Sequence, residues 1–346
     1  MPRAPRIILY GVGRYGCEFA RLAEARGWPI VAAVNRAGDK VGQPLAMLAG
    51  TRDTSVIVQD CSLADLAGAQ ADVGVVFTTD LLRDNLPAYR RLFEAGVDVL
   101  CHGVQSYYPW RYDPENSAIL HGLALAAGRS FTGSGIWDMS RIWAGILLAG
   151  PCVAITSLRH RSVTQVNYPS PRLVADYGLD LTPEDYAGRF GIASEHADTY
   201  RLIGKYQSIT EHVLSALGYH VTGGAERREP LTADIPVYCK ALARDIAPGR
   251  VIGWSYRSTV ETVEGVSAHA SMEMRLLDDD VPETMAWEID GRPGNRLVVE
   301  RRDSITASAA SILNRIPDVI AASPGIHLLS QLGPMRSTAP YKGGLT

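Results

Sequence analysis

The residues Gly11-Val12-Gly13-Arg14-Tyr15-Gly16 decide the fold, because they follow a short apolar run and open a run with helical periodicity. The apolar run, Arg6–Tyr10, is typical of a buried strand, and the helix predicted over Arg14–Arg26 ends at Gly27. The first glycine allows a tight turn, the second lets the backbone approach a pyrophosphate, and the third allows close helix–strand packing. The helix N-terminus adds N–H groups and a partial positive charge. We therefore predict a dinucleotide-binding turn, with cofactor contacts from Gly11, Gly13, Arg14, Tyr15 and Gly16.

Strands and helices continue to alternate through the first 135 residues. We predict further strands at Pro29–Val34, Val56–Gln59, Asp72–Thr79, Asp98–Cys101 and Ser130–Thr132, and helices at Arg83–Ala95, at Ser117–Ala127 and after a cap at Ser62. Strands separated by helices of this length pair in parallel. Residues 1–135 are therefore predicted to form an α/β domain with a Rossmann-type, doubly wound parallel sheet.

Residues 136–303 are predicted to form a second, α+β domain of mostly antiparallel strands. The expected elements are a long strand, Val153–Gln165, a helix begun by Thr182, a helix over Glu195–Leu217, and strands across residues 251–302 with turns at Asp278–Asp280 and Gly291–Gly294. On the long strand, His160 should face the side opposite Arg159 and Arg161. Trp254, Tyr256, Met272 and Met274 are interpreted as apolar residues on both faces of the sheet, so that one face can meet a second subunit. A last helix, Ile305–Ile316, is expected to end before Pro317 and a surface tail.

Composition and charge exclude several classes of protein. A net charge of −3 over 346 residues gives no global field to hold nucleic acid or an acidic membrane. The five cysteines are odd in number and form no C-x-x-C pair, which indicates reduced thiols. No run approaches the ~18 apolar residues of a membrane span, and the N-terminus lacks a signal-peptide pattern. We expect a cytoplasmic protein with no nucleic-acid or membrane partner. No metal-site motif and no G-x-S-x-G elbow is present.

The residues after the second and fourth strands bear on the choice of cofactor. In this fold an acid at the end of the second strand binds the ribose of NAD, but Asn35 and Arg36 stand there instead. No carboxylate repels a 2′-phosphate, and Arg36 can pair with one, so NADP(H) is favoured and NAD(H) remains an alternative. The other interpretation of Arg36 is a solvated loop charge. Thr78 and Thr79 follow the fourth strand, where they can bind cofactor phosphate or ribose or cap the next helix.

The candidate catalytic and substrate-binding residues follow the fifth and sixth predicted strands. His102 can donate a proton or hydrogen-bond the backbone, because imidazole titrates near neutral pH. Gln105 can orient a polar substrate, and Tyr107 and Tyr108 offer phenolic donors, of which Tyr108 is the candidate catalytic group. Trp137 would make an apolar wall of the pocket, and Asp138 either caps a helix or binds a substrate amine.

Several motifs together resemble those of a known group of enzymes. The chain resembles the dihydrodipicolinate reductase-like proteins, and more closely the group of 2,4-diaminopentanoate dehydrogenases and native amine dehydrogenases. The resemblance runs nearly end to end and rests on the glycine loop, Asp39–Gly42, Tyr108-Pro109-Trp110, Gly133-Ser134-Gly135, Tyr168–Pro171 with Gly178, and Thr306–Val319, the most specific block. It implies a homodimer through the second domain's sheet, a C-terminal segment (residues 304–346) that completes the cofactor domain, and NAD(P)-linked interconversion of an amine with an imine or ketone. Tyr168 is then a substrate contact.

Two departures from the group's pattern reshape the expected pocket. The group places an acidic residue shortly before Tyr-Pro-Trp, where it handles the ammonia proton; this chain has Val104 and Gln105 there. An Asn-Pro-Gly segment is replaced by Trp137-Asp138-Met139. The first hypothesis is therefore an NADPH-dependent reductase of C=N or C=O bonds in a small organic substrate. The alternatives are ammonia-dependent amine dehydrogenation, with Asp138 as the acid, and a non-catalytic NADP-binding sensor.

Overall fold

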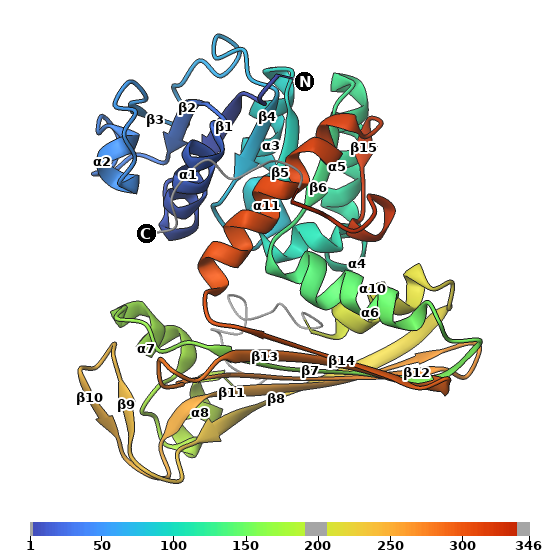
Figure 1. Ribbon diagram of the computed structural model, residues 1–346. Helices are drawn as coiled ribbons and strands as arrows, with labels where there is room; N and C mark the ends of the chain where they lie inside the picture. Colours follow the sequence, from blue (N-terminus) through green and yellow to red (C-terminus); the bar gives the residue numbers. More distant parts are fainter. Residues whose placement is uncertain (1–2, 191–205, 338–346) are drawn as a thin grey trace. The chain divides into compact units, whose positions relative to one another are not determined.

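The computed structural model describes residues 3–190 and 206–337, which form two compact units (Figure 1). Unit 1 comprises Met1–Met139 together with Asp303–Thr346, and unit 2 comprises Ser140–Arg302. Unit 1 is thus built from both ends of the chain, and unit 2 is inserted between them. No helix among the described residues is long and apolar enough to cross a membrane.

Unit 1 contains a seven-stranded sheet in the order β15-β6-β5-β4-β1-β2-β3, and every neighbouring pair is parallel. The strands are β1 (Ile7–Tyr10), β2 (Ile30–Asn35), β3 (Val58–Asp60), β4 (Val73–Val76), β5 (Asp98–Cys101), β6 (Ser130–Gly133) and β15 (Gly325–Ile326). The chain runs outward from β1 in one direction to β3 and then in the other from β4 to β15. The expected Rossmann-type, doubly wound sheet is therefore confirmed, with its switch point between β1 and β4.

Helices cover both faces of this sheet. On one face, α1 (Arg14–Arg26) and α11 (Ser304–Ala321) enclose a core that includes Phe19 and Ile312. On the other, α3 (Leu82–Glu94) and α5 (Pro114–Ala127) enclose a core that includes Tyr89 and Leu120. The shorter helices are α2 (Leu45–Ala49), η1 (Val104–Tyr107), α4 (Pro109–Tyr112) and η3 (Leu329–Gln331).

Two expectations for unit 1 are wrong. Ser62 caps no helix, because its N–H and hydroxyl both donate to Asp60 Oδ1, at 2.8 and 2.6 Å, in a local turn that competes with helix formation. The last helix does not end at Pro317 but continues to Ala321, because Ile316 and Val319 extend its buried apolar stripe. The tail beyond it supplies the edge strand β15 rather than only a surface strap, and residues 338–346 of that tail lie outside the described residues.

Unit 2 contains a six-stranded sheet in the order β14-β13-β7-β12-β11-β8, in which only the β12–β7 pair is parallel. Its strands are β7 (Ala154–Gln165), β8 (Val221–Thr232), β11 (Val251–Thr262), β12 (Ser267–Arg275), β13 (Glu283–Arg292) and β14 (Asn295–Arg301); β9 (Val237–Cys239) and β10 (Arg244–Ile246) form a separate hairpin. The helices are α6 (Ala144–Ala149), α7 (Pro171–Tyr177), α8 (Pro183–Phe190) and α10 (Gln207–Ala216), after the π-helical turn η2 (Asp138–Trp143). The mostly antiparallel second domain is confirmed.

Three details of unit 2 differ from expectation. Asp278–Asp280 joins β12 to β13, which are not neighbours, because β7 lies between them. The long helix is described only as α10, and residues 195–205 of the predicted range lie outside the described residues. Strand β8 was not predicted, because its glycines, charges and Pro230 hide any strand periodicity.

The two faces of the unit 2 sheet differ sharply in polarity. Register places Trp254 opposite Met274 and Tyr256 opposite Met272, so these residues share one face, toward which α10 packs. The expectation that they occupy both faces is therefore wrong. His160 lies on this buried face against Trp287, and burial lowers its pKa to about 3, so it stays neutral. Its neighbours Arg159 and Arg161 are exposed on the other face, as predicted.

A buried ion pair joins α11 to Asp138, near the end of the first of the two chain segments that form unit 1. Arg315 donates from Nε and Nη2 to the two carboxylate oxygens of Asp138, at 2.8 and 2.7 Å, and neither side chain is exposed. Ser134 Oγ adds a hydrogen bond of 2.8 Å to Asp138. The remaining Arg315 amino group, Nη1, donates to Asp318 and to the Gly333 carbonyl. The network joins residues nearly 180 positions apart in the chain.

We expect Asp138→Asn to destabilise unit 1 by about 3–5 kcal/mol, because it leaves a buried guanidinium without its charge partner. Asp318→Asn is the matched control: it removes the other carboxylate on Arg315, but that carboxylate is partly exposed, so the loss should be about 1 kcal/mol or less. Urea unfolding followed by circular dichroism measures both. Equal losses in the two variants would contradict the role given to the buried pair.

Candidate cofactor-binding and active site

The glycine loop between β1 and α1 has the geometry that the sequence predicts. Gly11 has φ +105°, and a Cβ there would lie 2.5 Å from the Phe77 carbonyl oxygen. A Cβ on Gly16 would lie 2.1 Å from the Gly11 carbonyl oxygen, so α1 could not approach β1 as it does. Gly13, the N-cap of α1, has no atom within 4 Å of where its Cβ would be. The first and third glycines thus serve the fold, and the second leaves the open approach that a pyrophosphate needs.

Polar side chains from the end of β2 fix the Val12 peptide of this loop. Asn35 Oδ1 accepts from the Val12 N–H at 3.2 Å, and Lys40 Nζ donates to the Val12 carbonyl at 2.6 Å. The Arg36 side chain is exposed and makes no hydrogen bond or ion pair with another described residue. Two cations therefore lie near the carboxyl end of β2. The sequence did not predict Lys40 as a residue of this site, because it reaches the glycine loop only through the folded turn after β2. Its place in the Asp39–Gly42 motif was the only indication of such a role.

The segment after β4 is held by hydrogen bonds that involve three predicted site residues. Gln105, expected to orient a substrate, accepts instead from the Leu82 N–H at 2.7 Å and so caps α3. Thr78 Oγ1 hydrogen-bonds Asn85 Oδ1, and Thr79 accepts from Asn85 Nδ2 through its carbonyl, at 2.8 Å. Helix α3 is thus capped by Gln105, which follows β5. The two residues of this contact are 23 positions apart in the chain, so sequence patterns do not reveal it.

His102 lies where the ends of β1, β5 and β6 meet. Its ring centroid is 4.5 Å from that of Tyr15, in the first turn of α1, and 5.6 Å from that of Phe77. On its other side is Gly135, whose Cβ would lie 3.1 Å from His102 Cδ2 and 2.4 Å from the Tyr107 hydroxyl. Tyr107 stacks on Trp137, with centroids 5.3 Å apart. The structure therefore brings His102, Tyr107 and Trp137 together beside the glycine loop.

The remaining predicted residues are more dispersed. Val104 is 8% exposed and donates its N–H to Asp80 Oδ1 at 3.0 Å. Asp80, which sequence reasoning missed, thus places an exposed carboxylate at the position where the group's acid is absent. Tyr108 is half-buried between η1 and α4. Tyr168 belongs to unit 2.

Two further groups near this site are structural. Asp138, considered as a partner for a substrate amine, is enclosed by Arg315 and Ser134 and has no exposed surface. The Cys101 thiol accepts hydrogen bonds from Tyr89 Oη at 2.9 Å and from the Gly103 N–H at 3.2 Å. Burial raises the pKa of Cys101, so this thiol stays protonated rather than becoming a nucleophile. Among the described residues, no three His, Cys, Asp or Glu side chains gather as metal ligands do.

Similarity to known proteins agrees with this architecture. The chain is 22% identical to the 2,4-diaminopentanoate dehydrogenase of Acetoanaerobium sticklandii, over 94% of this chain and 93% of that protein. Its structure matches that of an amine dehydrogenase from Mycobacterium smegmatis with a TM-score of 0.85 and 28% identity, over 97% and 98% of the two chains. A biliverdin reductase from Synechocystis shares the fold, at a TM-score of 0.54 and 13% identity over 94% of each chain.

A family model provides the assignment. The model of the 2,4-diaminopentanoate dehydrogenase C-terminal domain matches residues 144–339. This match covers more than half of the chain and includes the whole unit 2 sheet as well as α11 and β15. The chain therefore belongs to the 2,4-diaminopentanoate dehydrogenase C-terminal domain family.

Proposed function

We propose that this protein is an oxidoreductase that prefers NADP(H) and reduces the C=N or C=O bond of a small organic substrate. The observation that carries the proposal is the position of His102, which contacts Tyr15 in the first turn of α1 and lies, with the Tyr107 hydroxyl, beside Gly135. A proton donor thus stands next to the loop expected to hold the cofactor. The dehydrogenase and amine dehydrogenase named above support the reaction class.

The residues present fit a dinucleotide. Gly13 leaves open the space at the N-terminus of α1, and a Cβ there would fill it. Arg36 and Lys40 place positive charge near the end of β2, where the adenosine ribose lies in this fold, and no carboxylate ends that strand. A 2′-phosphate would meet attraction there rather than repulsion, which supports NADP(H) over NAD(H).

When bound, the nicotinamide cofactor supplies or accepts the hydride. His102 would donate a proton to the carbonyl oxygen or imine nitrogen, and the Tyr107 hydroxyl would orient that atom. The buried rings of Tyr107 and Trp137 would exclude water from one side of the substrate. General acid catalysis of this kind is worth about 10²–10⁴-fold in rate.

Asp80 favours a second candidate function, ammonia-dependent reductive amination. Its carboxylate hydrogen-bonds the Val104 N–H and is exposed, so it could accept a proton from ammonia where the group's own acid is missing. The structural likeness to the Mycobacterium smegmatis amine dehydrogenase points the same way. A non-catalytic NADP-binding sensor is the third hypothesis, which steady turnover of NADPH with any carbonyl or imine substrate would reject.

The cofactor preference should reside in Asn35 and Arg36. Changing Asn35→Asp with Arg36→Ala keeps an oxygen for the Val12 N–H but adds repulsion and removes a phosphate partner. The ratio of kcat/KM for NADPH to that for NADH should fall about tenfold or more, as expected for a lost charge-assisted hydrogen bond. Arg52→Ala, which removes another exposed arginine of unit 1, should leave the ratio unchanged. A wild-type protein that uses NADH as well as NADPH would refute the preference.

The reaction is tested with a panel of ketones and cyclic imines, with and without ammonia. We expect turnover of preformed imines or ketones and little amination from ammonia. His102→Ala should lower kcat about 10²–10⁴-fold with nearly unchanged NADPH affinity, whereas His327→Ala, a control at a half-buried histidine that hydrogen-bonds the Ser323 carbonyl, should not. Val104→Glu should raise ammonia-dependent turnover. Efficient amination by the wild type that Asp80→Asn abolishes would instead establish the second candidate.

We also propose a homodimer. The support is the exposed face of the unit 2 sheet, a surface of six strands with the exposed Val298, which pairs with Ala286, on its β14 edge. Because this face is polar, an interface formed by it would depend more on hydrogen bonds than on the burial of apolar surface. Light scattering at micromolar concentration should give twice the chain mass of 37.4 kDa; a single chain mass would argue against the dimer.

A further inference from the structure

The short segment at the end of β6 packs against the proposed proton donor. A Cβ on Gly133 would lie 2.2 Å from the Ser106 carbonyl oxygen, and one on Gly135 would lie 2.4 Å from the Tyr107 hydroxyl. Both glycines are therefore in direct contact with residues of η1, and a larger residue at either position would push η1 away. Gly135 also lies beside His102, whose Cδ2 would be 3.1 Å from the added carbon. The path of this segment thus helps to set where the two rings lie.

Ser134, between these two glycines, joins the segment to Asp138. Its hydroxyl donates to Asp138 Oδ2 at 2.8 Å, and the Asp138 N–H donates to the Gly135 carbonyl at 3.0 Å. The same carboxylate accepts two hydrogen bonds from Arg315 of α11. Through Asp138, a helix from the far end of the chain therefore holds the segment that lies beside His102.

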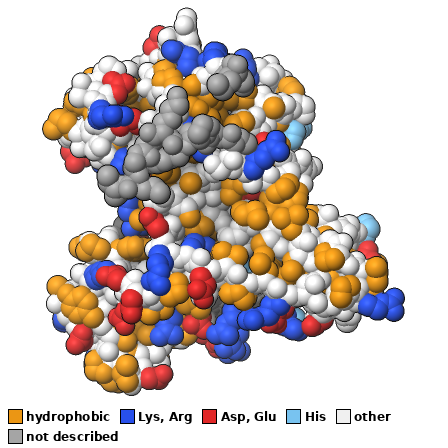
Figure 2. Space-filling view, in the orientation of Figure 1, with side chains coloured by type: hydrophobic (Ala, Val, Ile, Leu, Met, Phe, Trp, Pro, Cys, Tyr) orange, Lys and Arg blue, Asp and Glu red, His pale blue; other side chains and the backbone are white. Residues whose placement is uncertain are grey.

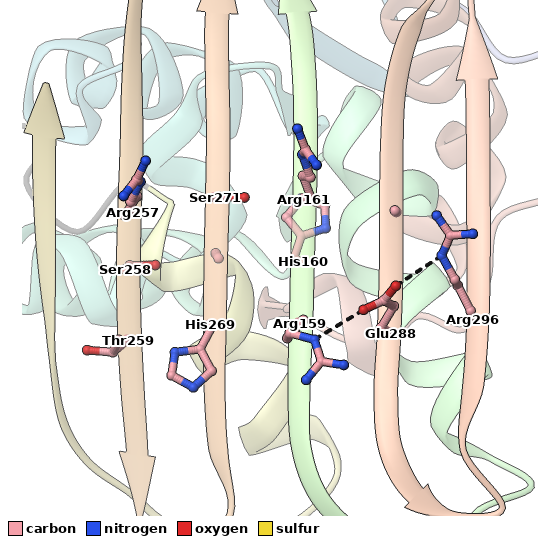
Figure 3. Close-up of a pocket in the computed structure, with 12 residues that line it drawn as sticks. Arg159, His160, Arg161, Arg257, Ser258, Thr259, His269, Ser271, Glu288 and Arg296 are labelled. Carbon is pink, nitrogen blue, oxygen red and sulfur yellow. Dashed lines mark hydrogen bonds and ion pairs between the residues drawn. The ribbon is translucent and has the colours of Figure 1, made fainter. Parts of the chain in front are cut away.

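The burial of this ion pair sets it apart from those at the surface. Charged side chains of both signs are interspersed over the visible surface of each unit (Figure 2), and the pairs of Glu288 with Arg159 and Arg296 are exposed in the single chain (Figure 3). Arg315 and Asp138 have no exposed surface. The cost of removing two charges from water offsets most of their attraction, so an apolar pair could stabilise the fold as well. What the ion pair adds is a fixed orientation, because a two-pronged arginine–carboxylate contact is directional.

We propose that Arg315 is a positioning residue for the proposed reaction. Acting through Asp138 and Ser134, it holds the end of β6 against the imidazole that donates the proton. Because Arg315 is fully buried, it acts only through these neighbours. The inference rests on the proposed function, since a proton transfer is what makes the placement of His102 matter. A displacement of about 1 Å in a reacting group can cost on the order of 10²-fold in rate.

Two serines of the same region provide a matched pair of variants. Ser134→Ala removes the link between the segment and Asp138 but leaves the ion pair with Arg315 in place. Ser130→Ala is the control, because this serine, at the start of β6, is equally buried and its hydroxyl donates to the Val319 carbonyl of α11 at 2.5 Å. Each variant loses one buried hydrogen bond, so urea unfolding should show similar losses of stability.

The first readout is turnover of NADPH with a carbonyl or imine substrate. In Ser134→Ala, kcat per NADPH-binding site should fall about 10–10²-fold with unchanged NADPH affinity. The solvent deuterium isotope effect on kcat should increase, because a misplaced donor slows proton transfer. Ser130→Ala should match the wild type in all three quantities. A merely structural role for Ser134 would reduce the number of binding sites and leave the rate at each remaining site unchanged.

The second readout needs no turnover. The chain has eight histidines, and the Cε1–H resonance of His102 can be assigned by its loss in His102→Ala. Its chemical shift reports the position of the ring relative to the aromatic ring of Tyr15, 4.5 Å away. The resonance should move in Ser134→Ala and stay in place in Ser130→Ala. It should also move in Arg315→Lys, which keeps the charge but loses the two-pronged contact; where that protein does not fold, Ser134→Ala decides.

Each outcome has one meaning. A moved resonance and slower turnover in Ser134→Ala, with neither in Ser130→Ala, support the proposal. An unmoved resonance, a normal kcat, or equal changes in the two variants overturns it while leaving the proposed function intact, and so does a loss of NADPH binding sites alone. A wild type that turns over no carbonyl or imine substrate refutes the proposed function and, with it, the reaction that this positioning serves.

Discussion

The contact between the Gly11 carbonyl and the backbone of Gly16 is the constraint on which the cofactor side of the molecule depends. A single added carbon at Gly16 would lie 2.1 Å from that carbonyl oxygen, well inside van der Waals contact. Only glycine therefore lets α1 lie so close to β1 that its first turn points across the sheet's carboxyl edge. From this placement follow the position of Val12 between Asn35 and Lys40, and the contact of Tyr15 with His102.

Local sequence signals were sufficient for six of the seven strands of unit 1. Buried parallel strands are short apolar runs, and glycine ends such as Gly27 and Gly128 mark where helices stop, so both can be recognised without tertiary information. The failures lie where a distant residue decides the local structure. Ile316 and Val319 carry α11 past Pro317 because their burial outweighs the missing hydrogen bond. Strand β8 exists because β11 pairs with it along its whole length, not because its own residues favour a strand.

The candidate site was predictable only in part, for the same reason. The glycines, Asn35, Arg36 and His102 stand at strand ends, so the chain topology alone places them on one edge. The tasks of Gln105, Asp80 and Lys40 depend on hydrogen bonds to backbone groups that become neighbours only in the folded unit. The prediction for Asp138 failed for a related reason. Its carboxylate was considered available to bind a ligand, but it is paired with Arg315, a residue far along the chain.

The division of unit 1 between both ends of the chain has a consequence for synthesis on the ribosome. Residues 1–139 emerge first, yet the α11 side chains that cover Ile7, Leu9 and Phe19 are made only after all of unit 2. Until then the β1 side of the nascent sheet keeps an uncovered apolar face, and Arg315 has not yet reached Asp138. Unit 2, whose sheet is contiguous in the chain, can fold before translation ends. The order of synthesis therefore leaves the half-built cofactor unit as the part of the nascent chain most exposed to aggregation and most in need of chaperones.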